Sequence, residues 1–165
     1  MNEVAESGAP DIAVVLATYN RRHSLPRAIA SVLAQEGVRF ELIVVDDASR
    51  DETGDYLATF RDPRIRTITA ECNGGPSAAR NLGLKAARAG IVAFLDSDDT
   101  YLPHRLAAPL AAFASDAGLV CTLSSAIRHD RKRSREARIP ATRLGRPASG
   151  SLWSVCRDRS KTVSP

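Results

Sequence analysis

Three carboxylates stand within four positions of one another, directly after a short apolar run. Asp96, Asp98 and Asp99 follow the run Ile91–Leu95, which is preceded by a glycine. Two carboxylates about 4 Å apart repel by roughly 4 kcal/mol at an effective dielectric constant of 20, so such a cluster favours a neutralising cation. Hard oxygen ligands without histidine or cysteine favour Mg²⁺ or Mn²⁺. The cluster therefore predicts a divalent-metal site, and an acidic turn that caps the next helix is the simpler alternative.

The apolar run in front of these carboxylates predicts a buried strand of a parallel sheet. Two earlier apolar runs, Ile12–Leu16 and Leu42–Val45, have the same character and also end in polar residues. The polar residues that follow these two runs are Thr18, Tyr19, Asn20, Asp46 and Asp47. Because the carboxyl ends of parallel strands meet at one edge of a sheet, we expect these side chains to converge with the three carboxylates.

Helix signals separate the strands along the chain. Helices are expected over Leu25–Leu33 with Ser24 as its cap, from the capping box Ser49/Glu52 to Phe60, from Pro76 to Ala89, and from Pro103 to Ser115; further strands are expected over Arg64–Ala70 and Leu119–Leu123. This alternation predicts an α/β fold with a mainly parallel sheet flanked by helices. The start of the helix at Pro76 supplies free backbone N–H groups beside Arg80, which suits an anionic ligand.

The chain has 165 residues, which suits one domain, and its charge is divided unevenly. Residues 1–127 carry 12 Lys and Arg against 16 Asp and Glu, whereas residues 128–165 carry 11 against 3. A basic tail can bind an anionic membrane surface, so peripheral association with the inner face of a membrane is one expectation for a chain that we otherwise place in the cytoplasm. Trp153 is the only aromatic residue in the tail, so we expect no nucleic-acid partner.

Four segments in order resemble the nucleotide-binding part of family 2 glycosyltransferases: VVLATYNR, ELIVVDDASRDET, NGGPSAARNLGLKAA and IVAFLDSDDTY. The resemblance runs from about Ile12 to Phe113 and implies the Rossmann-like GT-A fold. It implies that Tyr19 packs on the nucleobase, with Thr18 and Asn20 beside it. It also implies that Asp47 binds the base next to Asp46 and that Arg80 lies near the nucleotide. The acidic set that Asp96 opens would hold the ribose and the diphosphate-bound metal, with Asp96 and Asp98 binding substrate and Asp98 and Asp99 binding the metal.

The resemblance further implies an inverting, Mn²⁺- or Mg²⁺-dependent transfer of a sugar from a nucleoside-diphosphate sugar, with a uridine-linked donor favoured. The acceptor would be a hydroxyl group of a glycan, a lipid-linked sugar or another molecule. Such a reaction needs a general base near the acceptor, and none is identified, because the acidic residues after Asp116 stand in no recognisable motif. We therefore divide the chain into a polar lead-in (1–10), a GT-A region (11–126) and a basic, incomplete acceptor-side segment (127–165).

Two alternatives remain at this point. The missing base is compatible with a shortened, non-catalytic protein that still binds nucleotide. The segment IVAFLDSDDT also fits the first motif of haloacid-dehalogenase-like phosphatases, in which Asp96 would be the nucleophile and Asp98 the acid and base. That motif should open its domain, whereas here it follows several α/β elements.

Overall fold

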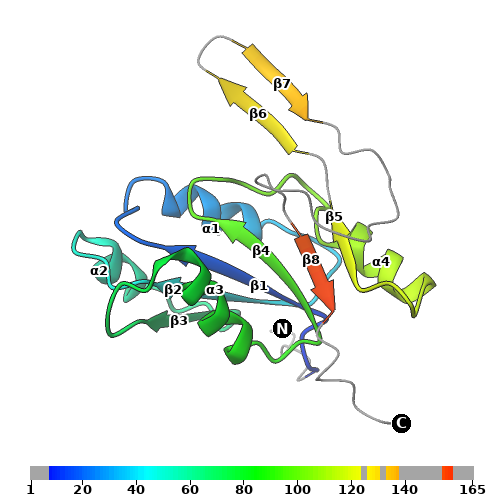
Figure 1. Cartoon of the computed structure of the whole chain (residues 1–165), viewed down its shortest axis with the longest axis horizontal. Helices are drawn as coiled ribbons and strands as arrows, with labels where there is room; N and C mark the ends of the chain where they lie inside the picture. The colour runs from blue at the N-terminus through cyan, green and yellow to red at the C-terminus, as the bar shows by residue number, and fades with distance from the viewer. Residues whose placement is uncertain (1–7, 124–125, 131–132, 138–153, 158–165) are drawn as a thin grey trace, which may run out of the picture.

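The computed structural model describes residues 8–123, 126–130, 133–137 and 154–157. These residues form a six-stranded sheet in the order β3-β2-β1-β4-β8-β5 and a separate two-stranded sheet, β6-β7 (Figure 1). The strands of the larger sheet are β1 (Ile12–Thr18), β2 (Phe40–Asp46), β3 (Ile65–Thr69), β4 (Ile91–Asp96), β5 (Cys121–Leu123) and β8 (Ser154–Arg157). The helices are α1 (Leu25–Leu33), α2 (Thr53–Leu57), α3 (Gly75–Ala86) and α4 (Ala107–Ser115).

The first four strands of the sheet confirm the expected parallel α/β arrangement. β1 pairs in parallel with both β2 and β4, and β2 pairs in parallel with β3. β8 is antiparallel to both β4 and β5, so the sheet changes direction at this edge. All parallel strands therefore end on one side of the molecule, where the acidic loops lie.

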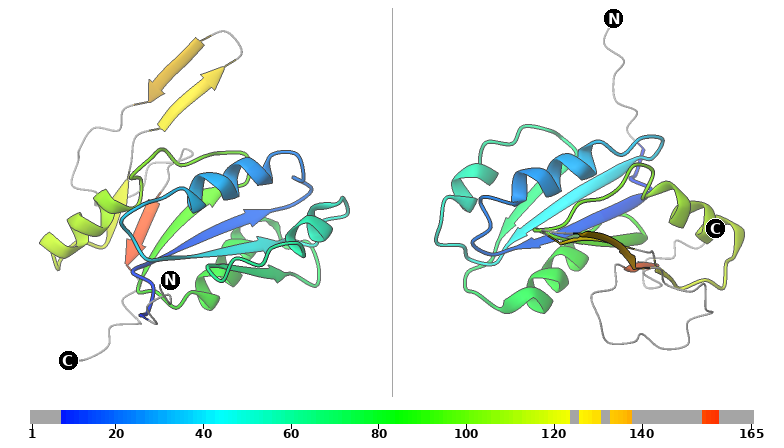
Figure 2. Two further views of the ribbon diagram at one scale, coloured as in Figure 1. Left: turned by 180° about the vertical axis from the view of Figure 1, so that it is seen from behind. Right: turned by 90° about the horizontal axis from the view of Figure 1, so that it is seen from above.

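Helices cover both faces of the parallel strands, as the two further views show (Figure 2). Alternate side chains of β1 belong to two different clusters. Ile12, Val14 and Leu16 pack with the buried face of α1 and with Phe113 of α4, whereas Ala13 and Val15 face α3. Gly83 explains how closely α3 approaches, because a Cβ atom at this position would lie 2.4 Å from Cγ1 of Val15.

Two helix starts differ from the expectation. The Ser49/Glu52 capping box does not form: α2 begins at Thr53, and the Ser49 hydroxyl instead accepts a hydrogen bond from the Asn20 N–H at 2.9 Å. α4 begins at Ala107 and not at Pro103, because His104 has a positive φ of 59° that interrupts helical geometry.

Side-chain bonds from Gln35, two residues after the end of α1, hold the turn that replaces the first part of the expected helix. The amide of Gln35 donates to the Leu102 carbonyl at 2.9 Å and accepts from the Leu106 N–H at 3.2 Å. At the start of α1, Ser24 occupies the cap position but its side chain makes no capping hydrogen bond. Local signals therefore located these helices but not the contacts that begin them.

The described residues after Leu123 form the strands β6, β7 and β8. β6 (Ala126–Asp130) and β7 (Arg133–Ala137) pair antiparallel and form the smaller sheet. β8 was not expected, because its four residues lie within a basic stretch in which we identified no strand pattern. Among the described residues, no helix combines the length and hydropathy needed to cross a membrane.

Candidate functional site

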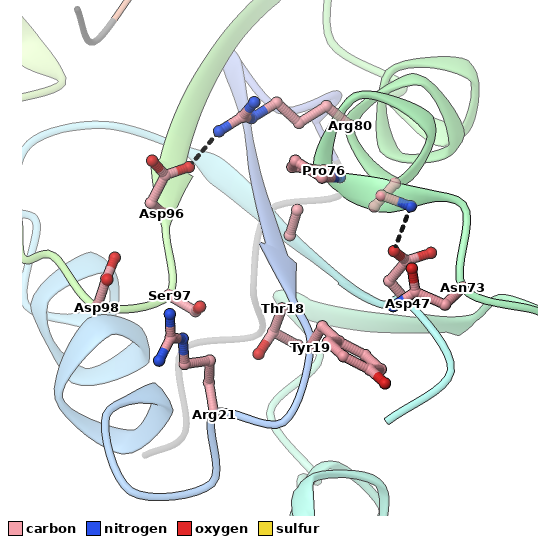
Figure 3. A pocket seen from close by; sticks show the side chains of 13 residues that line it. Thr18, Tyr19, Arg21, Asp47, Asn73, Pro76, Arg80, Asp96, Ser97 and Asp98 are labelled. Atoms are coloured by element: carbon pink, nitrogen blue, oxygen red, sulfur yellow. Dashed lines mark hydrogen bonds and ion pairs between the residues drawn. The ribbon is translucent and has the colours of Figure 1, made fainter. Parts of the chain in front are cut away.

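A cleft of about 460 Å³ opens at the carboxyl ends of β1, β2 and β4, against the start of α3 (Figure 3). Its polar lining comes from Thr18, Tyr19, Arg21, Asp47, Asn73, Arg80, Asp96, Ser97 and Asp98. Six of these nine residues were candidates from the sequence. The parallel topology thus brings together side chains that lie up to 80 positions apart in the chain.

The loop after β1 supplies one end of the cleft. Tyr19 is 39 % exposed and its ring lies on the side of Asp47 and Asn73 (Figure 3). Thr18 points into the cleft, and its buried hydroxyl has no hydrogen-bond partner among the described residues (Figure 3). An unpaired buried hydroxyl is costly, so a ligand that bonds to it would gain that contribution.

Asn20, a candidate from the same loop, does not line the cleft. Its side-chain oxygen accepts a hydrogen bond from the Arg50 N–H at 2.7 Å, and its own N–H donates to Ser49. Its φ of 51° reverses the chain, a conformation that asparagine tolerates better than most residues. Asn20 therefore braces the β1 loop against the β2 loop.

Asp46 and Asp47 are both almost fully buried at the end of β2, with different partners. Asp46 accepts a hydrogen bond from the Ser49 N–H at 3.0 Å and does not line the cleft. Asp47 accepts one from the Gly74 N–H at 2.9 Å and one from the Gly75 N–H at 2.7 Å. Both donors stand at the first turn of α3, so Asp47 fixes the start of this helix beside the cleft.

The loop after β4 carries the acidic cluster. Asp96 forms an ion pair with Arg80 of α3 across the cleft (Figure 3). Asp98 lines the cleft and is exposed, whereas Asp99 is outside the lining and its N–H closes a turn onto the Asp96 carbonyl at 3.0 Å. Partial desolvation and then the charges of Asp98 and Asp96 raise the pKa of the Asp99 carboxyl, and Arg27 opposes this shift.

This electrostatic pattern fits a divalent cation. Desolvation, and then the charges of the neighbouring carboxylates, disfavour ionisation of Asp99, and a bound cation would remove the repulsion between the carboxylates. The described residues include no cluster of three or more His, Cys, Asp or Glu side chains that could enclose a metal ion. Mg²⁺ commonly binds through only one or two carboxylates and completes its coordination with substrate phosphates and water. Asp98 and Asp99 are compatible with that mode of binding.

Sequence reasoning missed three residues that line the cleft: Arg21, Asn73 and Ser97. Arg21 and Ser97 stand directly beside candidate residues, and Asn73 precedes the glycines at the start of α3. Their types alone gave no chemical signal, because exposed Arg, Asn and Ser are common in loops. Proximity to the ends of buried parallel strands was the signal available for Arg21 and Ser97.

Comparisons with known proteins agree with this geometry. The sequence pattern of glycosyl transferase family 2 matches residues 13–158. The succinoglycan biosynthesis protein ExoO from Rhizobium meliloti is 50 % identical over 106 residues, which are 64 % of this chain and 30 % of that protein. This chain thus spans about a third of the length of that relative.

Two solved structures share the fold. The 1–349 part of TarS from S. aureus, solved in complex with UDP-GlcNAc, is 33 % identical and has a TM-score of 0.57; the match covers 64 % of this chain and 31 % of that TarS chain. A mannosyltransferase from Pyrobaculum calidifontis, solved with GDP-Man and Mn²⁺, has a TM-score of 0.63 and covers 74 % of this chain, which matches 37 % of that enzyme. At 23 % identity, the second structure supports the fold alone.

The family pattern spans nearly the whole chain, and its fold is the GT-A fold of these glycosyltransferases. The assignment leaves the phosphatase alternative without support. This chain belongs to glycosyl transferase family 2.

Proposed function

We propose that the cleft binds the nucleoside-diphosphate part of a sugar donor, with uridine as the base, for transfer of the sugar to an acceptor hydroxyl. The observation that carries this proposal is the convergence of Tyr19 and Asp47 at one end of the cleft with Arg80, Asp96 and Asp98 at the other. An aromatic ring and a buried carboxylate suit a nucleobase, and the charged end suits a diphosphate. The complex of TarS with UDP-GlcNAc supports a uridine donor in this family.

Within this proposal, Asp98 and Asp99 would hold Mg²⁺ or Mn²⁺ beside the diphosphate. When bound, the ion stabilises negative charge on the leaving diphosphate as a Lewis acid. The two carboxylates bring the negative charge that holds the cation, and Asp96 remains paired with Arg80 at the edge of the same loop. The first carboxylate therefore shapes the site and the next two bind the ion.

The proposed transfer is an inverting displacement at the anomeric carbon of the sugar. The acceptor oxygen forms a bond to this carbon while the bond from the carbon to the diphosphate oxygen breaks, and the diphosphate leaves with the electron pair. A general base takes the proton of the acceptor hydroxyl. No such base is assigned within the described residues, so the acceptor, a glycan, a lipid-linked sugar or another hydroxyl compound, is not identified by this site.

Calorimetric titration of the full chain with UDP tests the donor site. We expect binding in Mn²⁺ that is lost in excess chelator and falls about tenfold or more in Asp98→Asn and in Asp99→Asn, because each removes a charged ligand. Asp55→Asn is the matched control, since Asp55 is an exposed carboxylate on α2 outside the cleft lining.

Three outcomes contradict parts of the proposal. UDP binding that is equal with Mn²⁺ and with chelator would remove the metal from the proposal. Failure of the folded wild-type chain to bind UDP, checked by circular dichroism, would reject uridine diphosphate as the ligand. Binding without transfer to any acceptor would leave a nucleotide-binding chain that does not catalyse the reaction.

A further inference from the structure

The loop after β1 presents an arginine to the charged end of the cleft. Arg21 lines the cleft, and its guanidinium group points toward Ser97 and the acidic loop (Figure 3). Within the described part of the chain, this guanidinium forms no hydrogen bond, ion pair or ring contact. Arg21 is thus a positively charged side chain that faces the cleft without a partner.

The backbone of Arg21 is well anchored although its side chain is exposed. Its N–H donates to the hydroxyl of Thr53 at 3.3 Å, and its carbonyl accepts from the N–H groups of Ser24 at 3.1 Å and Leu25 at 3.0 Å. Asn20 precedes it in the left-handed conformation, so the chain reverses between Tyr19 and Arg21. Tyr19 therefore faces one end of the cleft and Arg21 faces the other (Figure 3).

Two other cations near the acidic loop, Arg80 and Arg27, are already engaged. Arg80 is paired with the carboxylate of Asp96. Arg27 donates to the Asp98 carbonyl at 3.1 Å. If Asp98 and Asp99 held a divalent cation, their two negative charges would balance its two positive charges. The negative charge of a bound diphosphate would then need another positively charged partner. Arg21 is the described cleft residue that can serve as this partner.

We propose that Arg21 binds the diphosphate of the donor through its guanidinium group, opposite Arg80. This inference rests on the proposed function and adds a specificity-determining residue to it. Guanidinium groups suit phosphate oxygens because their parallel N–H groups can bond two oxygens at once. Arg21 would then distinguish nucleoside diphosphates from nucleosides, whereas Tyr19 and Asp47 contact the base in both.

The test compares uridine and UDP as ligands of the full chain in Mn²⁺. In Arg21→Gln we expect the Kd of UDP to rise about 10-fold to 100-fold, the loss typical of a hydrogen bond to a charged group. The Kd of uridine, measured by ligand-observed NMR, should change less than about twofold, since uridine has no phosphate to lose contact with. Arg21→Lys should recover part of the UDP affinity, because it keeps the charge but not the two-point geometry.

Arg22→Gln is the matched control. Arg22 is the adjacent arginine, but its guanidinium lies over the Tyr56 ring, 4.2 Å from the ring centroid, and it does not line the cleft. Equal UDP affinity in Arg21→Gln and wild type, or equal losses in Arg21→Gln and Arg22→Gln, would overturn this inference and leave the donor site intact. A wild-type chain that fails to bind UDP would instead reject the proposed function, and this inference with it.

Discussion

A buried carboxylate stands at each end of β2 and accepts backbone hydrogen bonds, but the two carboxylates have different further partners. Glu41 near the start of the strand and Asp47 just after its end are both buried carboxylates. Each accepts hydrogen bonds from two backbone N–H groups of the chain at an end of α3. The single strand β2 therefore holds both ends of the helix that forms one wall of the cleft.

The partners of Glu41 complete its neutralisation inside the protein. One carboxylate oxygen accepts from the N–H groups of Arg88 at 2.6 Å and Ala89 at 3.2 Å. The other oxygen accepts from the side chains of Arg88 at 3.1 Å and Arg66 at 3.2 Å. Burial raises the pKa of Glu41, but these hydrogen bonds outweigh it and hold the pKa below its ordinary value.

Asp47 accepts only N–H groups of the helix start, and among the described residues no cation pairs with it. Its side chain lines the cleft, next to Tyr19 and Asn73 (Figure 3). The same chemistry thus stabilises the fold where cations close the site, and under the proposed function it serves ligand binding where the site stays open. The comparison predicts that substitutions at the two ends separate stability from affinity.

Glu41→Gln should have the largest effect on stability. The amide keeps an acceptor for the two backbone N–H groups but places an NH₂ group against the two guanidinium groups. We expect the free energy of unfolding to fall by about 2 to 3 kcal/mol, measured by urea denaturation at pH 7. UDP affinity should stay within about twofold of wild type when the variant is folded, because Glu41 lies at the far end of β2 from the cleft.

The pH dependence gives this prediction a second readout. Because the folded-state pKa of Glu41 is lowered, its charge stabilises the folded chain at neutral pH. That contribution is lost as the pH falls below the ordinary value of 4.5 and through the lowered pKa. The stability difference between wild type and Glu41→Gln should therefore shrink in acid. A difference that stays constant from pH 7 to pH 3 would contradict the electrostatic role of Glu41.

The sequence could predict β2 and its neighbouring strands, but not the different roles of Glu41 and Asp47. Unbroken apolar runs located β1, β2 and β4, because strands buried on both faces of a parallel sheet leave little room for polar residues. Glu41 opens such a run, and its partners lie 25 to 48 positions away. No local pattern indicates which buried carboxylate a distant arginine will neutralise.

The same limit applies to the loops and to the last strand. Ser49 and Glu52 have capping-box spacing, but Asn20 competes for the Ser49 hydroxyl from 29 positions away. β8 depends on pairing with β4 and β5 and not on its own apolar pattern. The rule that parallel strands end at one edge of the sheet placed most candidate residues correctly. The direction of each side chain, as for Asn20 and Arg21, depended instead on local turn geometry.

Asp47→Asn should reverse the outcome expected for Glu41→Gln. The amide keeps one acceptor but cannot accept from both Gly74 and Gly75, so we expect a loss of about 1 kcal/mol in the free energy of unfolding. The Kd of UDP should rise about tenfold or more, because the carboxylate that faces the base loses its charge and one acceptor. Calorimetry in Mn²⁺ measures this change. If Asp47→Asn lowered the free energy of unfolding by more than it lowered the free energy of UDP binding, the contrast between Glu41 and Asp47 would be wrong.

Arg88→Gln should have the smallest effect and sharpens the account of Glu41. The Arg88 side chain is 61 % exposed, so its ion pair with Glu41 is largely screened by water. We expect a loss of at most about 1 kcal/mol in urea denaturation, since exposed ion pairs contribute little. The backbone N–H of Arg88, which makes the shorter hydrogen bond to Glu41, survives this substitution. If Arg88→Gln costs as much as Glu41→Gln, the ion pair and not the bonding of the α3 end to β2 stabilises this end of the sheet.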